Sequence, residues 1–437
     1  MAEVIVIGGG LAGLAAAAAL GGAGHSVRLL ESRPFLGGRA TSYELTNGEV
    51  IDNCQHVLLR CCVNLLDFYR RLGVEGDIAF HCEFTFIEPG GKRGVLRRGL
   101  FPAPAHFAES FLRFPFLNFS EKLAVMQALR AIRRESAQRL DLDRITMQQW
   151  LEEKAQPARA IQRFWRQVLV SAINEELDRI AAVHAFQVFR LGFLARPDSY
   201  EMGIPAVPLG RLYRSEVWQR VSGVDIRCRS TVDRIQIENG TVRSVIAGGE
   251  ELRGDFYISA LPFERMATVA PGLGLDLTGF EHSPITGIHL WFDRPITDLP
   301  HATLLDRTIQ WMFNKSEGRY VQLVVSASRS LETLPRAEVI ALAQRELAEF
   351  FPPAREVRLE KAHVVKEVRA TFSARPGLET RRPASRTAVR NLFLAGDWTR
   401  SGWPATMEGA VRSGYLAAEA VAAAAGAPRK FLLQDIV

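Results

Sequence analysis

The sequence predicts an α/β fold in which a doubly wound nucleotide-binding domain is assembled from separated parts of the chain. Three observations predict it. A β-branched run at residues 4–7 is followed by a glycine-rich turn and an alanine-rich helix. A second strand, turn and helix follow one another from residue 391 onward, and short alternating strands lie between residues 224 and 261. The segments between these parts alternate in helical and strand character, which predicts an inserted α+β domain.

Composition bounds the class of protein. The chain has 437 residues, of which 47% are hydrophobic and 23% charged, so two domains are expected and disorder is excluded. The net charge of +6 suits an anionic membrane surface or a diphosphate, but also a solvated surface without function, and we expect no nucleic-acid partner. The five cysteines form no CxxC pair and no zinc spacing, so we expect no metal and a cytoplasmic location.

The opening turn has the spacing of a dinucleotide site. Gly8, Gly10 and Gly13 supply the pattern GxGxxG directly after the strand at residues 4–7. Gly8 permits the tight turn, Gly10 lets the backbone approach a diphosphate, and Gly13 lets helix and strand pack closely. Leu11 and Ala12 begin the helix, whose free N–H groups face the phosphates. The start of the chain therefore predicts a strand and turn rather than a signal peptide.

An acidic residue completes the unit. The second strand, residues 26–30, ends at Glu31, about 20 positions after the glycines, where a carboxylate accepts the ribose hydroxyls of a dinucleotide. A glycine-rich turn of another α/β protein is the alternative interpretation. The dinucleotide site is favoured because strand, turn, helix, second strand and acidic residue follow one another in the expected order.

The residues after Glu31 favour FAD over NAD. The run Glu31-Ser32-Arg33, then Gly37-Gly38-Arg39 and Ser42, resembles the E-x-R-x-x-x-G-G-R-x-x-S/T signature of the flavoprotein family that contains amine oxidases, protoporphyrinogen oxidase and carotenoid desaturases. The resemblance implies an amine-oxidase-like fold with a Rossmann-type FAD domain. It also implies that Ser32, Arg33, Gly38 and Arg39 lie at the cofactor, where an arginine offers a cationic fork to phosphate.

The carboxyl-terminal part resembles the same family. Gly396-Asp397 follows a predicted strand, and Trp403 and Met407 lie in the run before the last helix. The resemblance implies that Gly396 and Asp397 contact the ribityl and diphosphate region, and that the helix amino terminus faces the flavin ring, where it stabilises negative charge. Asp397 as a plain turn residue is the alternative. The resemblance also implies that the backbone of Val232 touches adenine.

These motifs divide the chain. We expect the FAD domain to comprise residues 1–90, 205–275 and 385–437, and the substrate domain to comprise 91–204 and 276–384. Periodicity predicts helices at 123–134, 147–154, 165–173 and 336–350, and strands at 285–292, 320–326 and 357–365. Asn239-Gly240 predicts a type I′ hairpin turn.

Aromatic and arginine residues alternate between residues 97 and 119. This stretch predicts either a surface that enters a membrane, or the mouth of a tunnel for an apolar substrate, or a loop that covers the core. No apolar run reaches about 18 residues, so we expect no spanning helix. Peripheral contact with the inner face of the plasma membrane is the corresponding expectation.

The loop after the Gly-Gly-Arg run narrows the substrate. Cys54 and Gln55 stand where most amine-oxidase relatives have glycines against the flavin. The run Asp52-Asn53-Cys54-Gln55-His56 resembles the squalene-associated FAD-dependent proteins, the hydroxysqualene dehydroxylases of hopanoid and C30 carotenoid synthesis. The resemblance implies reductive removal of a hydroxyl from hydroxysqualene, an apolar C30 isoprenoid, to give squalene. It leaves the electron donor unknown.

This chemistry needs a proton donor and a dry, electron-rich pocket. Asp52 and His56 are the catalytic candidates, with Glu408 as a third; the alternatives are a loop anchor for Asp52 and a core histidine for His56. The aromatic candidates are Trp291, Phe292, Trp311, Phe313 and Trp403. Three rival functions remain: an isoprenoid desaturase that runs the hydride the other way, a prenyl-binding escort protein, and a nicotinamide-dependent dehydrogenase, which the single GxGxxG disfavours.

Overall fold

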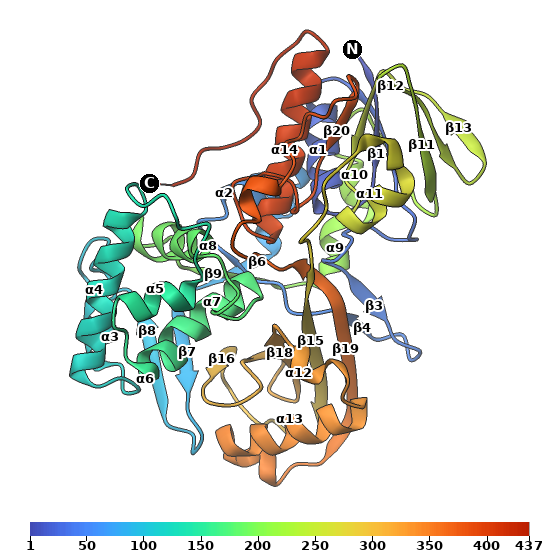
Figure 1. Ribbon diagram of the computed structural model, residues 1–437. Coiled ribbons are helices and arrows are strands. Elements are labelled where there is room, and N and C mark those ends of the chain that lie inside the picture. Colours follow the sequence, from blue (N-terminus) through green and yellow to red (C-terminus); the bar gives the residue numbers. More distant parts are fainter. Residues whose placement is uncertain (437) are drawn as a thin grey trace.

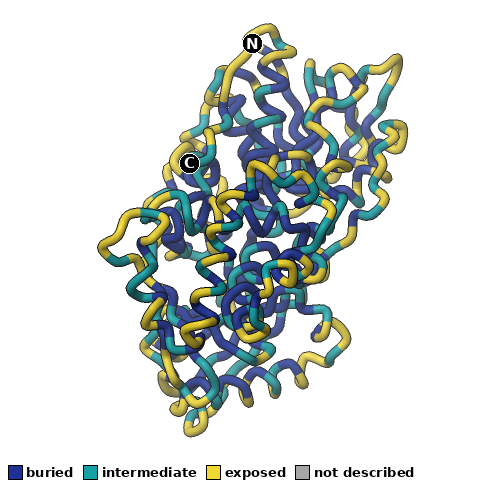
Figure 2. Tube along the Cα trace, turned by 60° about the vertical axis from the view of Figure 1, so that its left-hand side comes forward, coloured by how far each residue is buried: buried dark blue, intermediate teal, exposed yellow. Residues whose placement is uncertain are grey.

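The computed structural model describes residues 1–436, so residue 437, the last of the predicted FAD domain, lies outside the described residues. Figure 1 shows a parallel-sheet region at the top, a group of helices at the lower left and a second sheet at the bottom. The buried parts of the trace run without interruption through the middle of the molecule in Figure 2. Within the described part of the chain, no helix is long and apolar enough to cross a bilayer.

The upper sheet confirms the predicted fold class. Its order is β10-β2-β1-β14-β20 and every pair is parallel. The strands are β1 (Glu3–Ile7), β2 (Ser26–Leu30), β10 (Val224–Arg227), β14 (Phe256–Ser259) and β20 (Leu392–Leu394). These strands come from three separated stretches of sequence. Parallel strands that are covered on both faces are expected to be continuous apolar runs.

Two helices with small side chains pack beside this sheet. Helices α1 (Leu11–Gly22) and α14 (Met407–Ala424) lie against each other (Figure 1). A Cβ added at Gly414 would lie 2.2 Å from the Ala12 carbonyl oxygen, so the backbones approach as closely as glycine allows. The alanine-rich composition of both helices is therefore a packing requirement.

A three-stranded meander flanks the parallel sheet. It consists of β11 (Val232–Glu238), β12 (Thr241–Ala247) and β13 (Glu250–Leu252). Asn239 and Gly240 have φ of 51° and 71°, which confirms the hairpin turn with two left-handed residues.

The lower sheet has seven strands in the order β19-β15-β18-β17-β16-β7-β8. They are β7 (Glu83–Ile87), β8 (Arg93–Arg97), β15 (His282–Phe292), β16 (His301–Leu304), β17 (Trp311–Ser316), β18 (Tyr320–Ser326) and β19 (Leu359–Phe372). Helix α13 (Arg336–Phe350), as predicted, packs on one face of it. The domain boundary expected at residue 90 falls inside the β7–β8 hairpin, because β7 pairs with β16 of the second inserted segment.

The helical region has its own aromatic core. It contains α3 (Ala108–Arg113), α4 (Phe119–Glu135), α5 (Met147–Glu153), α6 (Ala158–Ala160), α7 (Arg166–Ile173) and α8 (Ala182–Gln187). Helix α4 begins four residues before the predicted start because Asn118 and Glu121 form a reciprocal capping box. Trp150, Trp165 and Phe186 pack edge to face between the helices.

Short elements join the regions. They are β3 (Ser42–Glu44), β4 (Val50–Asp52), β5 (Leu58–Leu59), β6 (Ile78–His81), β9 (Met202–Pro205), α2 (Val63–Leu72), α9 (Leu209–Tyr213), α10 (Ser215–Trp218), α11 (Phe263–Val269) and α12 (Arg329–Glu332). Strand β4 ends at Asp52, so this hairpin delivers the predicted catalytic loop to the junction between the two large sheets.

Candidate functional site

The turn between β1 and α1 has the geometry of a phosphate cradle. Gly8 has φ of +109°, and a Cβ at Gly13 would lie 2.0 Å from the Gly8 carbonyl oxygen. No side chain caps α1 at Gly10, so the first N–H groups, those of Leu11 and Ala12, stay open toward an anion. Gly8 and Gly13 therefore have the turn and packing roles that the spacing predicts, and the approach of Gly10 to a diphosphate stays a prediction.

Glu31 lies against this turn. Its buried carboxylate accepts hydrogen bonds from the backbone N–H groups of Gly9 and Arg33, both at 2.7 Å, and from Ser32 Oγ at 3.1 Å. Ser32 and Arg33 thus orient the acid, while the Arg33 guanidinium donates to the Gly38 carbonyl at 3.2 Å.

Val232 comes close to the same loop. The Ser230 backbone N–H donates to the Glu31 carbonyl at 2.8 Å, and β11 begins two residues later at Val232. The adenine contact implied for Val232 stays a prediction. Its position beside the acid is consistent with that role.

The two halves of the flavin signature meet in space. Arg39 and Asp397 form an ion pair of 2.6 Å, although 358 residues separate them. Burial lowers the pKa of Arg39, but the charge and hydrogen bond of Asp397, together with the charges of Glu264 and Glu367, hold the pKa above its ordinary value. Gly396 donates its N–H to Ser413 of α14 at 2.8 Å, and Gly38 packs so closely on Gly10 that a Cβ would lie 2.9 Å from the Gly10 Cα.

An apolar cavity of about 590 Å³, within the size range of ligand sites, is lined in part by Gln55 and by the amino terminus of α14. Its walls come from the helical region, from β7, β17 and β18, and from the amino terminus of α14. Aromatic side chains form much of its lining: Phe84, Phe86, Phe107, Phe111, Phe164, Phe189, Phe193, Trp311, Phe313 and Trp403.

Comparison with known proteins identifies the family. The profile of flavin containing amine oxidoreductases matches residues 11–422. The chain belongs to this family. It is 25% identical over 96% of its length to a 15-cis-phytoene desaturase of an Oncidium hybrid cultivar, covering 77% of that protein. It is 26% identical to a probable zeta-carotene desaturase of Synechococcus elongatus, covering 96% of this chain and 98% of that one.

Solved structures show the same fold. Cyclohexylamine oxidase from Brevibacterium oxydans superposes with a TM-score of 0.68 at 18% identity, covering 97% of this chain and 99% of that one. Family membership and the cradle together identify the cofactor as FAD. The open helix terminus, the glycine contacts and the buried Glu31 carboxylate fit its diphosphate and ribose.

Asp52 is held by several partners near the cradle. One carboxylate oxygen accepts from Ser42 Oγ at 2.8 Å and from the Leu209 backbone N–H at 2.9 Å. The other pairs with Lys315 Nζ at 3.4 Å, and the same ammonium donates to Gln55 Oε1 at 3.1 Å. Gln55 lines the cavity, whereas Asp52 does not. The contacts of Asp52 are those of a loop anchor, and its catalytic role stays a prediction.

His56 stays within its own loop. Its Nδ1 lies 3.1 Å from the Cys54 carbonyl oxygen, and burial lowers the pKa of the imidazole. A histidine with a lowered pKa is a neutral ring at pH 7 and a poor proton donor. Burial also raises the pKa of the Cys54 thiol to about 12, so the thiol is protonated at neutral pH.

Glu408, the third candidate, is the carboxyl group that lines the cavity. It accepts from the Leu65 and Asn64 backbone N–H groups at 2.7 and 3.2 Å and from Asn64 Nδ2 at 2.9 Å. Arg412 lies 3.8 Å away. Burial outweighs these partners and raises the pKa of Glu408 to about 7, so the group is partly protonated at neutral pH.

The carboxyl-terminal motif frames one end of the cavity. Trp403 and Met407 both line it, and Trp403 Nε1 donates to Asp435 at 3.2 Å. Thr406 caps α14 by accepting the Gly409 N–H at 3.0 Å. The amino terminus of α14 is thus presented to the cavity.

The aromatic candidates divide into two groups. Trp311 and Phe313 line the cavity and stack on each other, with ring centroids 5.5 Å apart. Trp291 stacks on Tyr320 at 4.4 Å outside the cavity, and Phe292 is buried in the core under α13. Alternation along β17 brings Trp311 and Phe313 to one face of the sheet.

Sequence reasoning missed Lys315. It lies on β17 outside every recognised motif, and only strand pairing brings it to Asp52 and Gln55. The sequence offered one signal for this residue: a single lysine that closely follows the apolar run from Trp311 to Phe313.

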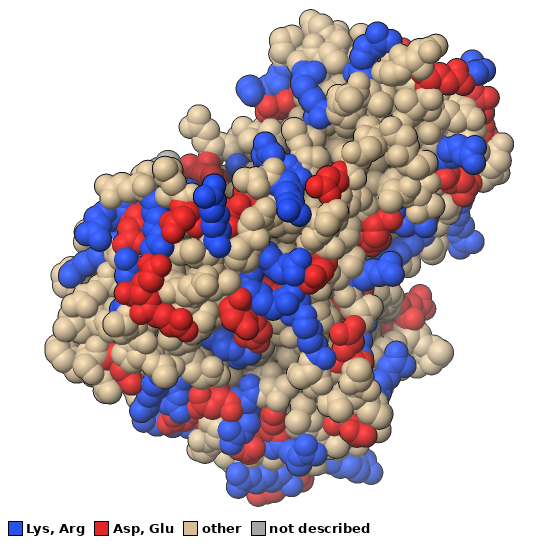
Figure 3. All heavy atoms as spheres, in the orientation of Figure 1, with Lys and Arg blue, Asp and Glu red and all other residues tan. Residues whose placement is uncertain are grey.

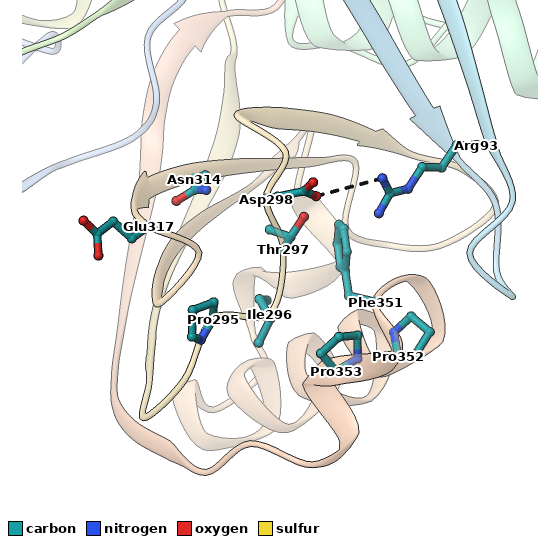
Figure 4. A pocket seen from close by; sticks show the side chains of 10 residues that line it. All are labelled: Arg93, Pro295, Ile296, Thr297, Asp298, Asn314, Glu317, Phe351, Pro352 and Pro353. Atoms are coloured by element: carbon teal, nitrogen blue, oxygen red, sulfur yellow. Dashed lines mark ion pairs between the residues drawn. The ribbon is translucent and has the colours of Figure 1, made fainter.

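A second hollow, of about 450 Å³, lies apart from this site at the edge of the lower sheet. Figure 4 shows Asp298 facing Arg93, 4.0 Å away, above Phe351 and two prolines. None of the predicted site residues lines it. Among residues 1–436, no group of three His, Cys, Asp or Glu residues is arranged to hold a metal.

Proposed function

We propose that this flavin-dependent oxidoreductase removes the hydroxyl group of hydroxysqualene to give squalene. The observation that supports it most is the apolar cavity of about 590 Å³, lined by aromatic side chains and by Met407 and Glu408 at the amino terminus of α14. A long isoprenoid has no polar groups along its chain, and this lining offers it apolar contacts almost throughout.

Loss of the hydroxyl requires a proton, because hydroxide is a poor leaving group. Glu408 supplies it best among the three candidates: it lines the cavity and its pKa of about 7 keeps a proton available at neutral pH. The proton goes to the substrate oxygen, the carbon–oxygen bond breaks and water leaves. Reduced FAD, when bound, supplies the hydride and both electrons for the new carbon–hydrogen bond.

The carbon that loses the hydroxyl becomes electron-poor. Aromatic faces stabilise such a centre, and exclusion of water protects it from recapture. Trp311 and Phe313, stacked on each other in the cavity wall, are the side chains that we expect in this role.

Product analysis tests the proposal. Holoprotein reduced without oxygen is incubated with hydroxysqualene, and squalene is measured by mass spectrometry. Trp311→Leu should lower the rate of squalene formation by about tenfold or more, because the variant loses one cation–π contact in a dry site. Trp291→Leu, a stacked tryptophan outside the cavity, is the matched control and should retain the rate. Absence of squalene while the flavin stays reduced refutes the proposal.

A desaturase is the second candidate, because the two relatives compared above are desaturases of C40 isoprenoids. It would take hydride from the substrate onto oxidised FAD. Oxidised holoprotein incubated with squalene or a C40 polyene would then yield conjugated products that absorb visible light. Their appearance, without conversion of hydroxysqualene, favours this candidate.

A binding protein that escorts prenyl groups without catalysis is the remaining alternative. The presence of Glu31, Arg39 and Asp397 disfavours it, because the resemblance implies that these residues hold the cofactor. Purified protein without flavin absorption at about 450 nm would favour a binding protein.

A further inference from the structure

An exposed apolar surface lies beside the cavity. Five side chains of one segment are exposed although they are large and apolar: Leu100, Phe101, Leu112, Phe119 and Leu123. Leu100 and Phe119 are 93% and 73% exposed. Elsewhere in residues 1–436 such side chains occur singly, so this group is a patch, which we name the α3–α4 patch.

The patch continues into the cavity along one face of α4. Phe119, Leu123, Met126, Arg130 and Arg133 follow one another at spacings of three and four residues, which places them within an arc of about 80°. The first two are exposed, and the last three line the cavity. One stripe therefore runs from the outer surface to the cavity wall.

The cavity opens at the same place. Among its lining residues the exposed ones are Val57, Pro104, Ala105, Arg130 and Arg133. Four of these five belong to the segment that carries the patch. Helices α3 and α4 are held together here, because Lys122 Nζ donates to the Leu112 carbonyl at 2.7 Å.

The charge around the patch is positive. Segment 97–134 contains seven basic residues, Arg97, Arg98, Arg113, Lys122, Arg130, Arg133 and Arg134, and two acidic ones, Glu109 and Glu121. Lys122 is buried, and Arg97, Arg98 and Arg134 pair with Glu83, Glu201 and Glu135. Glu121 is buried in the α4 cap, and in the described structure Arg113, Arg130 and Arg133 form no ion pair. The left-hand edge of Figure 3, over α3 and α4, is largely uncharged, with both basic and acidic side chains beside it.

We propose that the α3–α4 patch docks the protein on a membrane that contains anionic lipid, with the cavity mouth against the bilayer. Apolar side chains enter the boundary between headgroups and acyl chains, and arginines contact lipid phosphates, which is how monotopic surfaces bind. A water-insoluble substrate then passes from the bilayer into the cavity without crossing water. This entry route rests on the proposed function; the docking surface does not.

Vesicle binding tests the docking. Holoprotein is sedimented with vesicles of phosphatidylcholine and phosphatidylglycerol, and with phosphatidylcholine alone. The double variant Phe119→Ser/Leu123→Ser should lower the partition coefficient by about tenfold or more, given the area that two such side chains bury. Val368→Ser on β19, with 44% exposure against 40% for Leu123, is the matched control and should partition like the wild type. Arg113→Gln should weaken binding to the anionic vesicles selectively.

Either of two vesicle results overturns the proposal: wild-type protein that stays in solution with anionic vesicles, or a double variant that partitions like the wild type. Light scattering gives the mass of each protein in solution. A wild-type dimer that becomes a monomer in the double variant also overturns the proposal, because the patch would then bind a second copy of the chain. Squalene formation from detergent-dispersed substrate is measured in parallel. Its absence with intact vesicle binding refutes the proposed function and leaves the docking surface standing.

Discussion

Two glycines of one helix should respond to the same substitution with opposite sign. In Gly13→Ala the new Cβ would lie 2.0 Å from the Gly8 carbonyl oxygen, whereas such contacts do not fall below 3.0 Å. Helix α1 must therefore move from β1 by about 1 Å, and overpacking of this size costs about 3 kcal/mol. The shift also opens the phosphate cradle, so FAD should be lost together with stability.

Gly22→Ala is the matched control in the same helix. Nothing lies within 4 Å of its added Cβ, and the position is exposed. Alanine is the better helix former, so the free energy of unfolding should rise by about 0.5 kcal/mol. Urea unfolding of the apoproteins and FAD titration by fluorescence quenching measure both effects. A Gly13→Ala protein as stable as the wild type, with full flavin content, would refute the packing argument.

Three further predictions concern charged groups. Arg39→Ala leaves Asp397 buried without its cation and should weaken FAD binding by about tenfold, seen as flavin lost on gel filtration. The pKa of Glu408 in the folded protein is raised to about 7. Its protonated form therefore contributes stability that is fully present below the ordinary carboxyl pKa and is lost as pH rises through 7. The free energy of unfolding of the wild type, relative to that of Glu408→Gln, should fall between pH 5 and pH 8 by on the order of 3 kcal/mol. Lys315→Met should destabilise the protein by about 1–3 kcal/mol in urea unfolding, because Asp52 loses its ion pair.

Each of these has a distinct contrary outcome. Arg39→Lys should restore part of the flavin content that Arg39→Ala loses. Equal flavin content in the wild type, Arg39→Ala and Arg39→Lys would contradict a role of the Arg39–Asp397 ion pair in FAD binding. A stability difference for Glu408→Gln that stays flat with pH shows that the carboxyl does not titrate in this range. For Lys315, the double variant with Asp52→Asn should cost less than the sum of the single changes; full additivity contradicts the ion pair.

The sequence by itself determined the cofactor site. Gly8, Gly13 and Glu31 lie within one βαβ unit, so their spacing fixes their arrangement through local geometry. The hairpin at Asn239-Gly240 was predictable for the same reason, because a two-residue turn depends on its own φ angles. The resemblance implied only that Arg39 and Asp397 each lie at the cofactor. The ion pair between them was not predicted, since no local rule joins residues 358 apart.

Tertiary structure decided the parts that depend on long-range pairing. The parallel pairing of β7 with β16 put residues on both sides of position 90 into the lower sheet, and periodicity does not reveal partners. The same sheet brought Lys315 to Asp52 and separated Trp311, in the cavity wall, from Trp291, outside it. Glu408 became the leading candidate for the proposed proton donor only through burial, because the pKa of a carboxyl depends on what surrounds it in space.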